Sequence, residues 1–221
     1  MVLGEAGDYA ASVTATNRFG VDTCEFNLHV AGWHIELVDD EGPVGKFASL
    51  ALDSAERPHI AYMHYDGANA IEFLKYAYHD GDAWHVEVVD DEGDVGWSCS
   101  LALDSLDRPH ISYHDARDEA LDLTEDLNYA YHDGSSWHIE TVDSEGRVGV
   151  SSSLALDSLD RPRISYSYSE SGDLRYAWFG GSEWHIETVD SEGSVGQGSS
   201  LALDSLENPH IAYKDNSNSN L

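Results

Sequence analysis

The chain has 221 residues, 41% of them hydrophobic and 10% aromatic, a composition typical of a folded globular protein. Its 42 acidic and 11 basic residues give a formal net charge of -31, which argues against nucleic acid or an anionic membrane surface as a partner. No run reaches the roughly 20 apolar residues of a membrane span, and the first residues lack the charged and apolar regions of a signal peptide. We therefore predict no membrane insertion.

The first 30 residues differ from the rest of the chain. Polar–apolar alternation predicts two strands here, Tyr9–Thr16 and Thr23–Val30, around the turn "NRFG". The stretch "GDYAASVTATNRFG" resembles the end of a PKD domain, an Ig-like module whose last strands read G-x-Y-x-V-x-V-x-A-x-N-x-x-G. The resemblance implies that residues 1–30 are the C-terminal strands of a PKD-like domain. It also implies a secreted parent protein, located outside the cell or on its surface.

A repeat occupies the remainder of the chain. The phrase "SLALDSAERPHIAY" and its near copies begin at Ser49, Ser100, Ser153 and Ser200. A second phrase, "WHIETVD" or a close variant, begins at Trp33, Trp84, Trp137 and Trp184, with spacings of 51, 53 and 47 residues. Each unit contains four short segments of strand-like pattern, separated by Gly, Asp, Ser and Pro turn signals. Four strands in about 50 residues predict one β-propeller blade per unit.

We therefore predict an all-β fold in which residues 31–221 form propeller blades. Residues 46–90, 97–143 and 150–190 predict three complete four-stranded blades, and the last phrase predicts two strands of a fourth. Residues Trp33–Val38 read as an outer strand with no blade of its own. Three interpretations remain open: a four-bladed ring with a reduced last blade, a fragment of a longer propeller, or self-association of copies to complete a ring. The fragment is favoured.

The blades of residues 33–221 resemble the "SLALDSxGxPHISYYD" repeats of bacterial and archaeal extracellular propeller proteins, which are distant relatives of the Asp-box propellers of sialidases. The Asp-box turn D-x-G-x-x-W is present only approximately, as "HDGDAW", "HDGSSW" and "FGGSEW". The resemblance implies a non-enzymatic binding or interaction module for a protein or glycan partner. The alternative is a carbohydrate-active enzyme of the sialidase-like class. No residue is assigned as catalytic.

The repeated Trp-His pairs have two competing interpretations. They are either packing anchors with a hydrogen-bonded indole, or a ring of lectin sites in which each tryptophan is an aromatic platform and each histidine a donor. In propellers the loops after the outer and second strands share one face, where we expect the partner, and two arginines belong to these loops. The candidate ligand-binding residues are Trp84, His85, Trp137, His138, Trp184, His185, Arg117 and Arg147.

The turn after each outer strand, "DDEG" or "DSEG", is the candidate metal site. Two carboxylates before a glycine could offer oxygen ligands to calcium, although one turn alone supplies too few. The candidate ligands are Asp90, Glu92, Asp143, Glu145, Asp190 and Glu192. The competing interpretation is a solvated Asp/Gly turn.

The overall acidity of the chain has two competing interpretations as well: adaptation of the surface to high salt, or collection of divalent cations. Cys24 and Cys99 match no metal-ligand spacing, and their positions leave open whether either forms a disulfide.

Two other repeated positions are expected to be structural. The histidine of "PHI" recurs at His59, His110 and His210 but is Arg163 in the third unit, which argues against a ring of metal ligands. We expect instead a hydrogen bond to the neighbouring blade. The aspartate that ends "SLALD" predicts an Asx-type turn in every unit.

Overall fold

The computed structural model describes residues 7–17, 20–30, 35–67, 71–116 and 125–221. Its contacts divide the chain into two units, Met1–Leu37 and Val38–Leu221. In the first unit, strands β1 (Gly7–Asn17) and β2 (Gly20–Val30) form an antiparallel hairpin. The two predicted N-terminal strands are therefore confirmed, and the assignment to a PKD-like domain stays a prediction.

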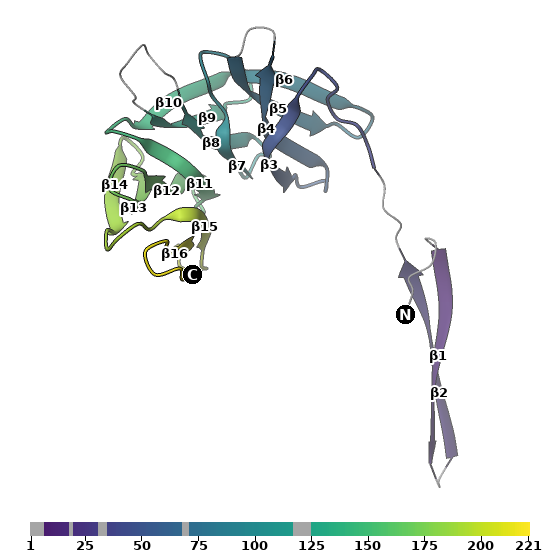
Figure 1. Ribbon diagram of the computed structural model, residues 1–221. Coiled ribbons are helices and arrows are strands. Elements are labelled where there is room, and N and C mark those ends of the chain that lie inside the picture. The colour runs from purple at the N-terminus through teal and green to yellow at the C-terminus, as the bar shows by residue number, and fades with distance from the viewer. Residues whose placement is uncertain (1–6, 18–19, 31–34, 68–70, 117–124) are drawn as a thin grey trace. The chain divides into compact units, whose positions relative to one another are not determined.

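The second unit consists of three four-stranded antiparallel sheets followed by a two-stranded one (Figure 1). Blade 1 contains β3 (Val44–Leu52), β4 (Pro58–Asp66), β5 (Ile71–His79) and β6 (Trp84–Asp90). Blade 2 contains β7 (Trp97–Leu103), β8 (Pro109–Asp115), β9 (Asp126–His132) and β10 (Trp137–Asp143). Blade 3 contains β11 (Val148–Leu156), β12 (Pro162–Tyr168), β13 (Asp173–Phe179) and β14 (Trp184–Asp190). The half-blade contains β15 (Gln197–Leu203) and β16 (Pro209–Lys214).

The sheets are arranged as propeller blades. The first strands of successive sheets contact one another, β3 with β7, β7 with β11, and β11 with β15. Figure 1 shows these four strands on the inner side of an arc, with β6, β10 and β14 on its outer side. The predicted propeller fold is confirmed, and blades 1 and 3 begin at Val44 and Val148, slightly before the predicted residues 46 and 150. Among the described residues, no helix is long and apolar enough to cross a membrane.

The predicted outer strand at Trp33–Val38 is wrong for the part that the structure describes. Residues 35–38 are not in a strand, and the side chains of Ile35 and Leu37 are 90% and 75% exposed. A strand shares a ladder of backbone hydrogen bonds with a neighbouring strand, and residues 35–38 belong to none of the sheets formed by the described residues. Trp33 lies outside the described residues.

The hydrophobic core lies between the blades. One cluster combines Leu74 and Tyr76 of blade 1 with Leu101 and Tyr113 of blade 2. The corresponding cluster between blades 2 and 3 contains the equivalents of these four residues, Leu127, Tyr129, Leu154 and Tyr166. A blade therefore buries its apolar side chains only when another blade covers it, as expected for a repeat architecture.

A hydrogen bond, buried in two cases and partly buried in two, joins the second strand of each blade to the end of the preceding outer strand or, for blade 1, to the segment before β3. We call this contact, between an aspartate and a tyrosine hydroxyl, the Asp–Tyr clasp. The four clasps are Tyr62–Asp39, Tyr113–Asp90, Tyr166–Asp143 and Tyr213–Asp190, with O···O distances of 2.6–2.7 Å and a sequence separation of 23 residues in every case. The side chains of Tyr113 and Tyr166 are fully buried. Burial, followed by the charge of Asp143, raises the pKa of Tyr166, so this hydroxyl stays protonated and donates.

The serines of the repeated phrase bond to the next blade. The first serine accepts the backbone N–H of the following blade's leucine, as Ser49 Oγ does from Leu101 at 3.0 Å. The second serine donates both its N–H and its O–H to an acidic side chain in the next turn, as Ser54 does to Asp107 at 2.9 and 2.6 Å. The same two contacts link blade 2 to blade 3 and blade 3 to the half-blade.

The acidic residue in that turn occupies a strained backbone position. Asp107, Asp160 and Glu207 have φ values of 62°, 59° and 65°, a region that favours glycine. The resembling repeats carry glycine at this position. A carboxylate here offsets the backbone strain because it accepts two hydrogen bonds from the preceding blade. The phrase is therefore repeated because each copy bonds to the next.

Removing one clasp hydroxyl should destabilise the protein measurably. We expect Tyr166→Phe to lower the free energy of unfolding by about 1.5–3 kcal/mol, because it leaves the buried Asp143 carboxylate without one donor. Urea unfolding followed by circular dichroism measures this change. The matched control is Tyr168→Phe, which removes a hydroxyl bonded to the exposed Glu170 and should cost no more than about 0.5 kcal/mol. Equal losses for the two variants would contradict a structural role for the clasp.

Candidate functional site

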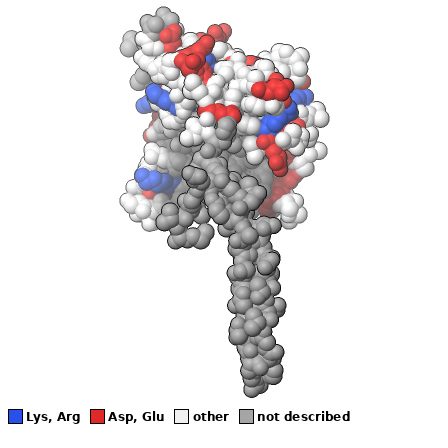
Figure 2. Space-filling view, turned by 90° about the vertical axis from the view of Figure 1, so that its right-hand side faces the viewer, with Lys and Arg blue, Asp and Glu red and all other residues white. Residues whose placement is uncertain are grey.

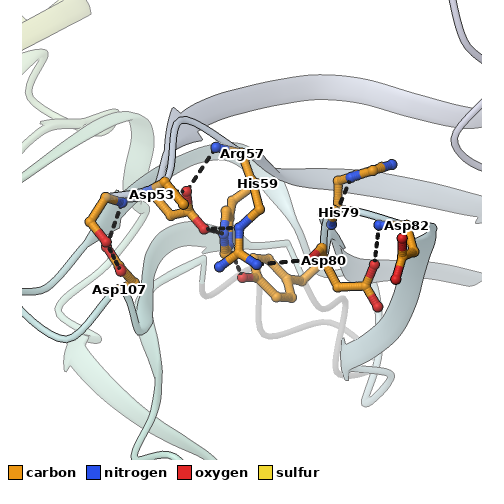
Figure 3. A network of polar contacts seen from close by, with 11 residues as sticks. Asp53, Arg57, His59, His79, Asp80, Asp82 and Asp107 are labelled. Carbon is orange, nitrogen blue, oxygen red and sulfur yellow. Dashed lines mark hydrogen bonds and ion pairs between the residues drawn. The ribbon is translucent and has the colours of Figure 1, made fainter.

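Each blade has two ends. The turn end carries the turns between the first and second strands and between the third and fourth, and the loop end carries the other two connections. At the turn end of blade 1, Asp53 Oδ1 accepts the backbone N–H groups of Ala55 and Arg57 at 2.9 and 2.7 Å. Its Oδ2 accepts Arg57 Nε at 2.6 Å, and Arg57 Nη1 donates to the Asp80 carbonyl at 2.8 Å. Arg57 thus ties the two turns together (Figure 3), and the predicted Asx-type turn is confirmed.

These bonds keep the turn aspartate ionised. Burial raises the pKa of Asp53, but the hydrogen bonds from Arg57 and Ala55 outweigh it and bring the pKa to about 2. Burial likewise raises the pKa values of Asp104 and Asp157, but hydrogen bonds outweigh it and lower them, from Arg108 and Leu106 to Asp104 and from Arg161, Arg163 and Leu159 to Asp157. The turn end of each complete blade therefore presents a paired arginine beside a charged aspartate.

The "PHI" histidines bond within their own blade, so the predicted bond to a neighbouring blade is wrong. His59 and His110 contact the hydroxyls of Tyr76 and Tyr129 through Nδ1. Their Nε2 atoms lie 3.5 Å from the turn aspartate of the same blade. Adjacent strands of one sheet bring these side chains together, since His59 pairs with Tyr78 two residues from Tyr76. Arg163 also contacts its own blade, donating to Asp157 at 2.9 Å.

Two equivalent pockets lie between blades at the turn end. The larger, about 360 Å³, lies between blades 2 and 3 and the smaller, about 280 Å³, between blades 1 and 2. Both are near the lower end of the range for small-molecule sites. The tryptophan that starts the outer strand lines each one: Trp184 in the larger pocket and Trp137 in the smaller.

A glutamate of the preceding blade orients each tryptophan. Trp184 Nε1 donates to Glu140 at 3.1 Å, and Trp137 Nε1 donates to Glu87 at 2.9 Å. The edge of the Trp184 ring meets Tyr129, with the centroids 5.4 Å apart. Because the indole N–H is held by a carboxylate and one edge by a tyrosine, the rest of the half-buried ring forms a rigid apolar wall.

Groups of both charges surround the apolar wall of the larger pocket. Phe179 and Leu159 extend the apolar surface beside Trp184. The polar lining residues are Asp104, Arg108, His110, Tyr129, Tyr131, His132, Asp133, Glu140, Asp160 and Arg161. Burial lowers the pKa of His110 although Asp104 opposes the shift, so this imidazole is neutral at pH 7, with its two nitrogens facing the Tyr129 hydroxyl and Asp104. The pocket thus combines an aromatic platform with hydrogen-bonding groups of every kind.

The structure brings only part of the predicted ligand-binding set together. Trp137 and Trp184 line pockets, whereas their neighbours His138 and His185 stack on Tyr131 and Trp178 with centroids 5.0 and 5.2 Å apart. In blade 1, His85 likewise stacks on Tyr78 and contacts Asp80 at 2.6 Å, and Trp84 packs edge-on against His79. The histidines therefore support the third strand rather than line the pocket.

Neither predicted arginine is found beside the tryptophans in the pockets. Arg147 follows β10 at the loop end, where its Nε donates to Glu125 at 2.8 Å, so the length of a blade separates it from both pockets. Arg117 lies outside the described residues. The pockets are consequently on the opposite face from the loops where the sequence predicted the partner.

The predicted calcium ligands form the Asp–Tyr clasps and the turns that follow them. Asp90, Asp143 and Asp190 each accept a tyrosine hydroxyl, and Arg175 also donates to Asp143 at 2.8 Å. The backbone N–H groups of Glu92, Glu145 and Glu192 close Asx-type turns onto these aspartates. Over the described residues, no group of three or more His, Cys, Asp or Glu side chains is arranged to hold a metal ion. Calcium binding stays a prediction.

Cys99 is a buried free thiol, and burial raises its pKa to about 12.

The glutamates that hold the indoles were not predicted, although a signal for them exists. Each follows the tryptophan by three residues, in "WHVE" or "WHIE". Side chains three apart on a strand point to opposite faces. A tryptophan and a glutamate at this spacing therefore face different blades, and the glutamate of one blade meets the tryptophan of the next.

Comparisons with known proteins provide only a fold. No protein-family model matches the chain, and no curated protein matches it. Among solved structures, it is similar to a protein of unknown function from Dyadobacter fermentans DSM 18053, with a TM-score of 0.61 and 10% identity over 95% of this chain and 72% of the other. It is also similar to a fucose lectin from Kordia zhangzhouensis, solved with methyl-fucoside, with a TM-score of 0.46 and 15% identity over 66% of this chain and 99% of the lectin.

The turn aspartates should make stability depend on acid pH. The folded-state pKa of Asp53, about 2, lies below its ordinary value of 3.8, so its contribution to stability is present above that ordinary value and is lost as the pH falls toward 2. We expect Asp53→Asn to be less stable than the parent at pH 7, with the difference shrinking between about pH 4 and pH 2. Urea midpoints over this range measure it. A difference that stays constant with pH would contradict the assignment.

Proposed function

We propose that the protein is a non-enzymatic glycan-binding module whose sites are the pockets between blades. One observation carries the proposal: the same combination of an oriented tryptophan, a carboxylate, a histidine and an arginine occurs at two successive blade interfaces. Packing alone explains a buried tryptophan, but it does not explain a cavity of about 360 Å³ left open beside the ring.

The chemistry of the lining suits a sugar ring. One face of a pyranose presents C–H groups that pack on an aromatic ring, and its hydroxyls both donate and accept hydrogen bonds. Trp184 and Phe179 supply the apolar platform. Glu140 and Asp160 can accept from hydroxyls, and Arg108, which keeps further N–H groups beyond those bound to Asp104 and the Asp133 carbonyl, can donate. Small-molecule sites typically have this form, a largely apolar cavity with a few polar groups.

The charge of the pocket favours neutral sugars. In the larger pocket, Asp104, Asp133, Glu140 and Asp160 outnumber Arg108 and Arg161. The arginines of the three complete turns each bind the aspartate of their own turn, so they do not gather around one carboxylated sugar. For this reason we do not propose the sialidase-like alternative. An extracellular or cell-surface location belongs to the proposal and rests on the resemblance of the repeats and of the N-terminal strands.

The first test is a glycan array with the purified chain, followed by calorimetry on the best ligand. We expect selective binding of neutral glycans with two sites per chain. Trp184→Ala should reduce this to one site, and the double variant Trp137→Ala/Trp184→Ala should weaken binding at least about tenfold, because each variant removes an aromatic platform.

The matched control is Trp97→Ala, which removes an indole at the loop end, where it bonds to Glu72 and packs at a tilt against Phe47. It should keep both sites. Glu140→Gln gives a milder change, because the amide oxygen still accepts from Trp184 while the charge is lost. Thermal unfolding of each variant confirms that it is folded. A blank array from folded protein, or equal effects of Trp97→Ala and Trp184→Ala, would contradict the proposal.

A further inference from the structure

The first blade exposes a face that every later blade buries. Leu50 of β3 is 62% exposed, whereas its equivalents Leu101, Leu154 and Leu201 are 7–8% exposed because the preceding blade covers them. Leu52, next on the same side of the strand, is 58% exposed. The β3 face therefore has the composition of an internal blade interface, and no blade covers it among the described residues.

The same face carries the polar half of the internal interface. Glu56 has a φ of 61° and occupies the position of Asp107 and Asp160, which accept two hydrogen bonds from the preceding blade. Among the described residues, no hydrogen bond to the Glu56 carboxylate is found. A strained acidic residue has no local advantage over glycine here. An acidic residue is favourable here only when a serine of a preceding blade donates hydrogen bonds to it, as at Asp107 and Asp160.

The complementary half of the interface is at the other end of the propeller unit. Ser200 is equivalent to Ser49, Ser100 and Ser153, whose hydroxyls accept the N–H of the next blade's leucine. Ser205 is equivalent to Ser54, Ser105 and Ser158, which donate to the next blade's acidic residue. Both Ser200 and Ser205 are exposed, and so is Ala202 between them.

We propose that a second copy of this chain docks head to tail, with the β15–β16 half-blade of one copy on the β3 face of the next. The contact repeats the internal interface: Ser200 accepts from Leu50 N–H, Ser205 donates to Glu56, and Leu50 becomes buried. A second copy is the partner because the two half-interfaces of one chain match each other residue by residue. A head-to-tail contact closes into a ring or continues as a filament, according to the rotation between copies.

Charge sets the conditions for this association. Each copy carries a net charge of -31, and Figure 2 shows acidic side chains in several separate groups on the face drawn. Like-charged copies repel at low ionic strength, and at about 1 M salt, where the Debye length is about 3 Å, this repulsion is screened. Burial of Leu50 is not weakened by salt. Association should therefore increase with salt, which is the opposite of an assembly held by ion pairs.

The test is the mass of the full chain by light scattering after size exclusion, at about 1 M salt and over a range of protein concentrations. We expect at least twice the 24.3 kDa of one chain at high concentration. Leu50→Asp should give a monomer. The matched control is Leu106→Asp, which also replaces a leucine that is 68% exposed but lies away from both end faces, and it should associate like the parent.

Cross-linking gives a second measurement that does not depend on a disruptive variant. In a Cys24→Ser background, Ser205→Cys and Glu56→Cys chains are mixed under mild oxidation. We expect a disulfide-linked dimer from the mixture and little from either variant alone. A parent chain that is monomeric at every concentration and salt overturns the proposal. So does an oligomer that Leu50→Asp leaves intact, because the contact would then involve another surface. Neither result depends on glycan binding.

Discussion

The buried hydrogen bond from a tyrosine hydroxyl to an aspartate of the preceding repeat is the contact on which the arrangement of the blades depends. Tyr113 and Tyr166 are fully buried, and Asp90 and Asp143 nearly so. Leaving either partner unsatisfied would cost about 1–3 kcal/mol, so successive blades are restricted to positions in which both groups meet. The separation of 23 residues is constant because it spans only one connection and one inner hairpin. At the other end of the blades, serine–carboxylate and indole–carboxylate bonds complete the interface and border the pockets.

The clasp also changes the interpretation of the acidity. The turns and blade interfaces use carboxylates at four kinds of structural position, represented by Asp39 of the clasp, Asp53 of the turn, Asp107 of the serine contact and Glu87 on the outer strand. All four accept hydrogen bonds. Part of the negative charge is therefore required by the blade interfaces themselves, beside any adaptation of the surface to salt or to cations. Only three lysines and eight arginines balance it, and several of these, including Arg57 and Lys75, are paired with the structural carboxylates.

The two interpretations of the repeated tryptophan are compatible. Trp184 is a packing anchor with its N–H bonded to Glu140, and it is also a wall of the larger of the two equivalent pockets. The spacing of tryptophan and glutamate gives a signal for the contact, but the sequence could not show the pocket, because the glutamate belongs to a different blade 44 residues away. The histidine of "PHI" was assigned to the wrong neighbour for a related reason. Its partners are on the adjacent strand of its own sheet, and the pairing register of that sheet is not visible in a single strand.

The sequence alone determined the strands of the three complete blades and of the half-blade. Period-2 alternation, turn residues and a repeat of about 50 residues are local properties, and a strand and its turn are specified by residues close together in the chain. Only the tertiary structure decided which side chains of different blades meet. The contacts that border the pockets join residues 44–55 positions apart, and that spacing varies with the length of each loop. The tryptophans therefore lie with the turn arginines, and Arg147 lies at the opposite end of the blades. Which end of a strand a residue occupies follows from the sequence, but which cavity it borders follows from how two sheets pack.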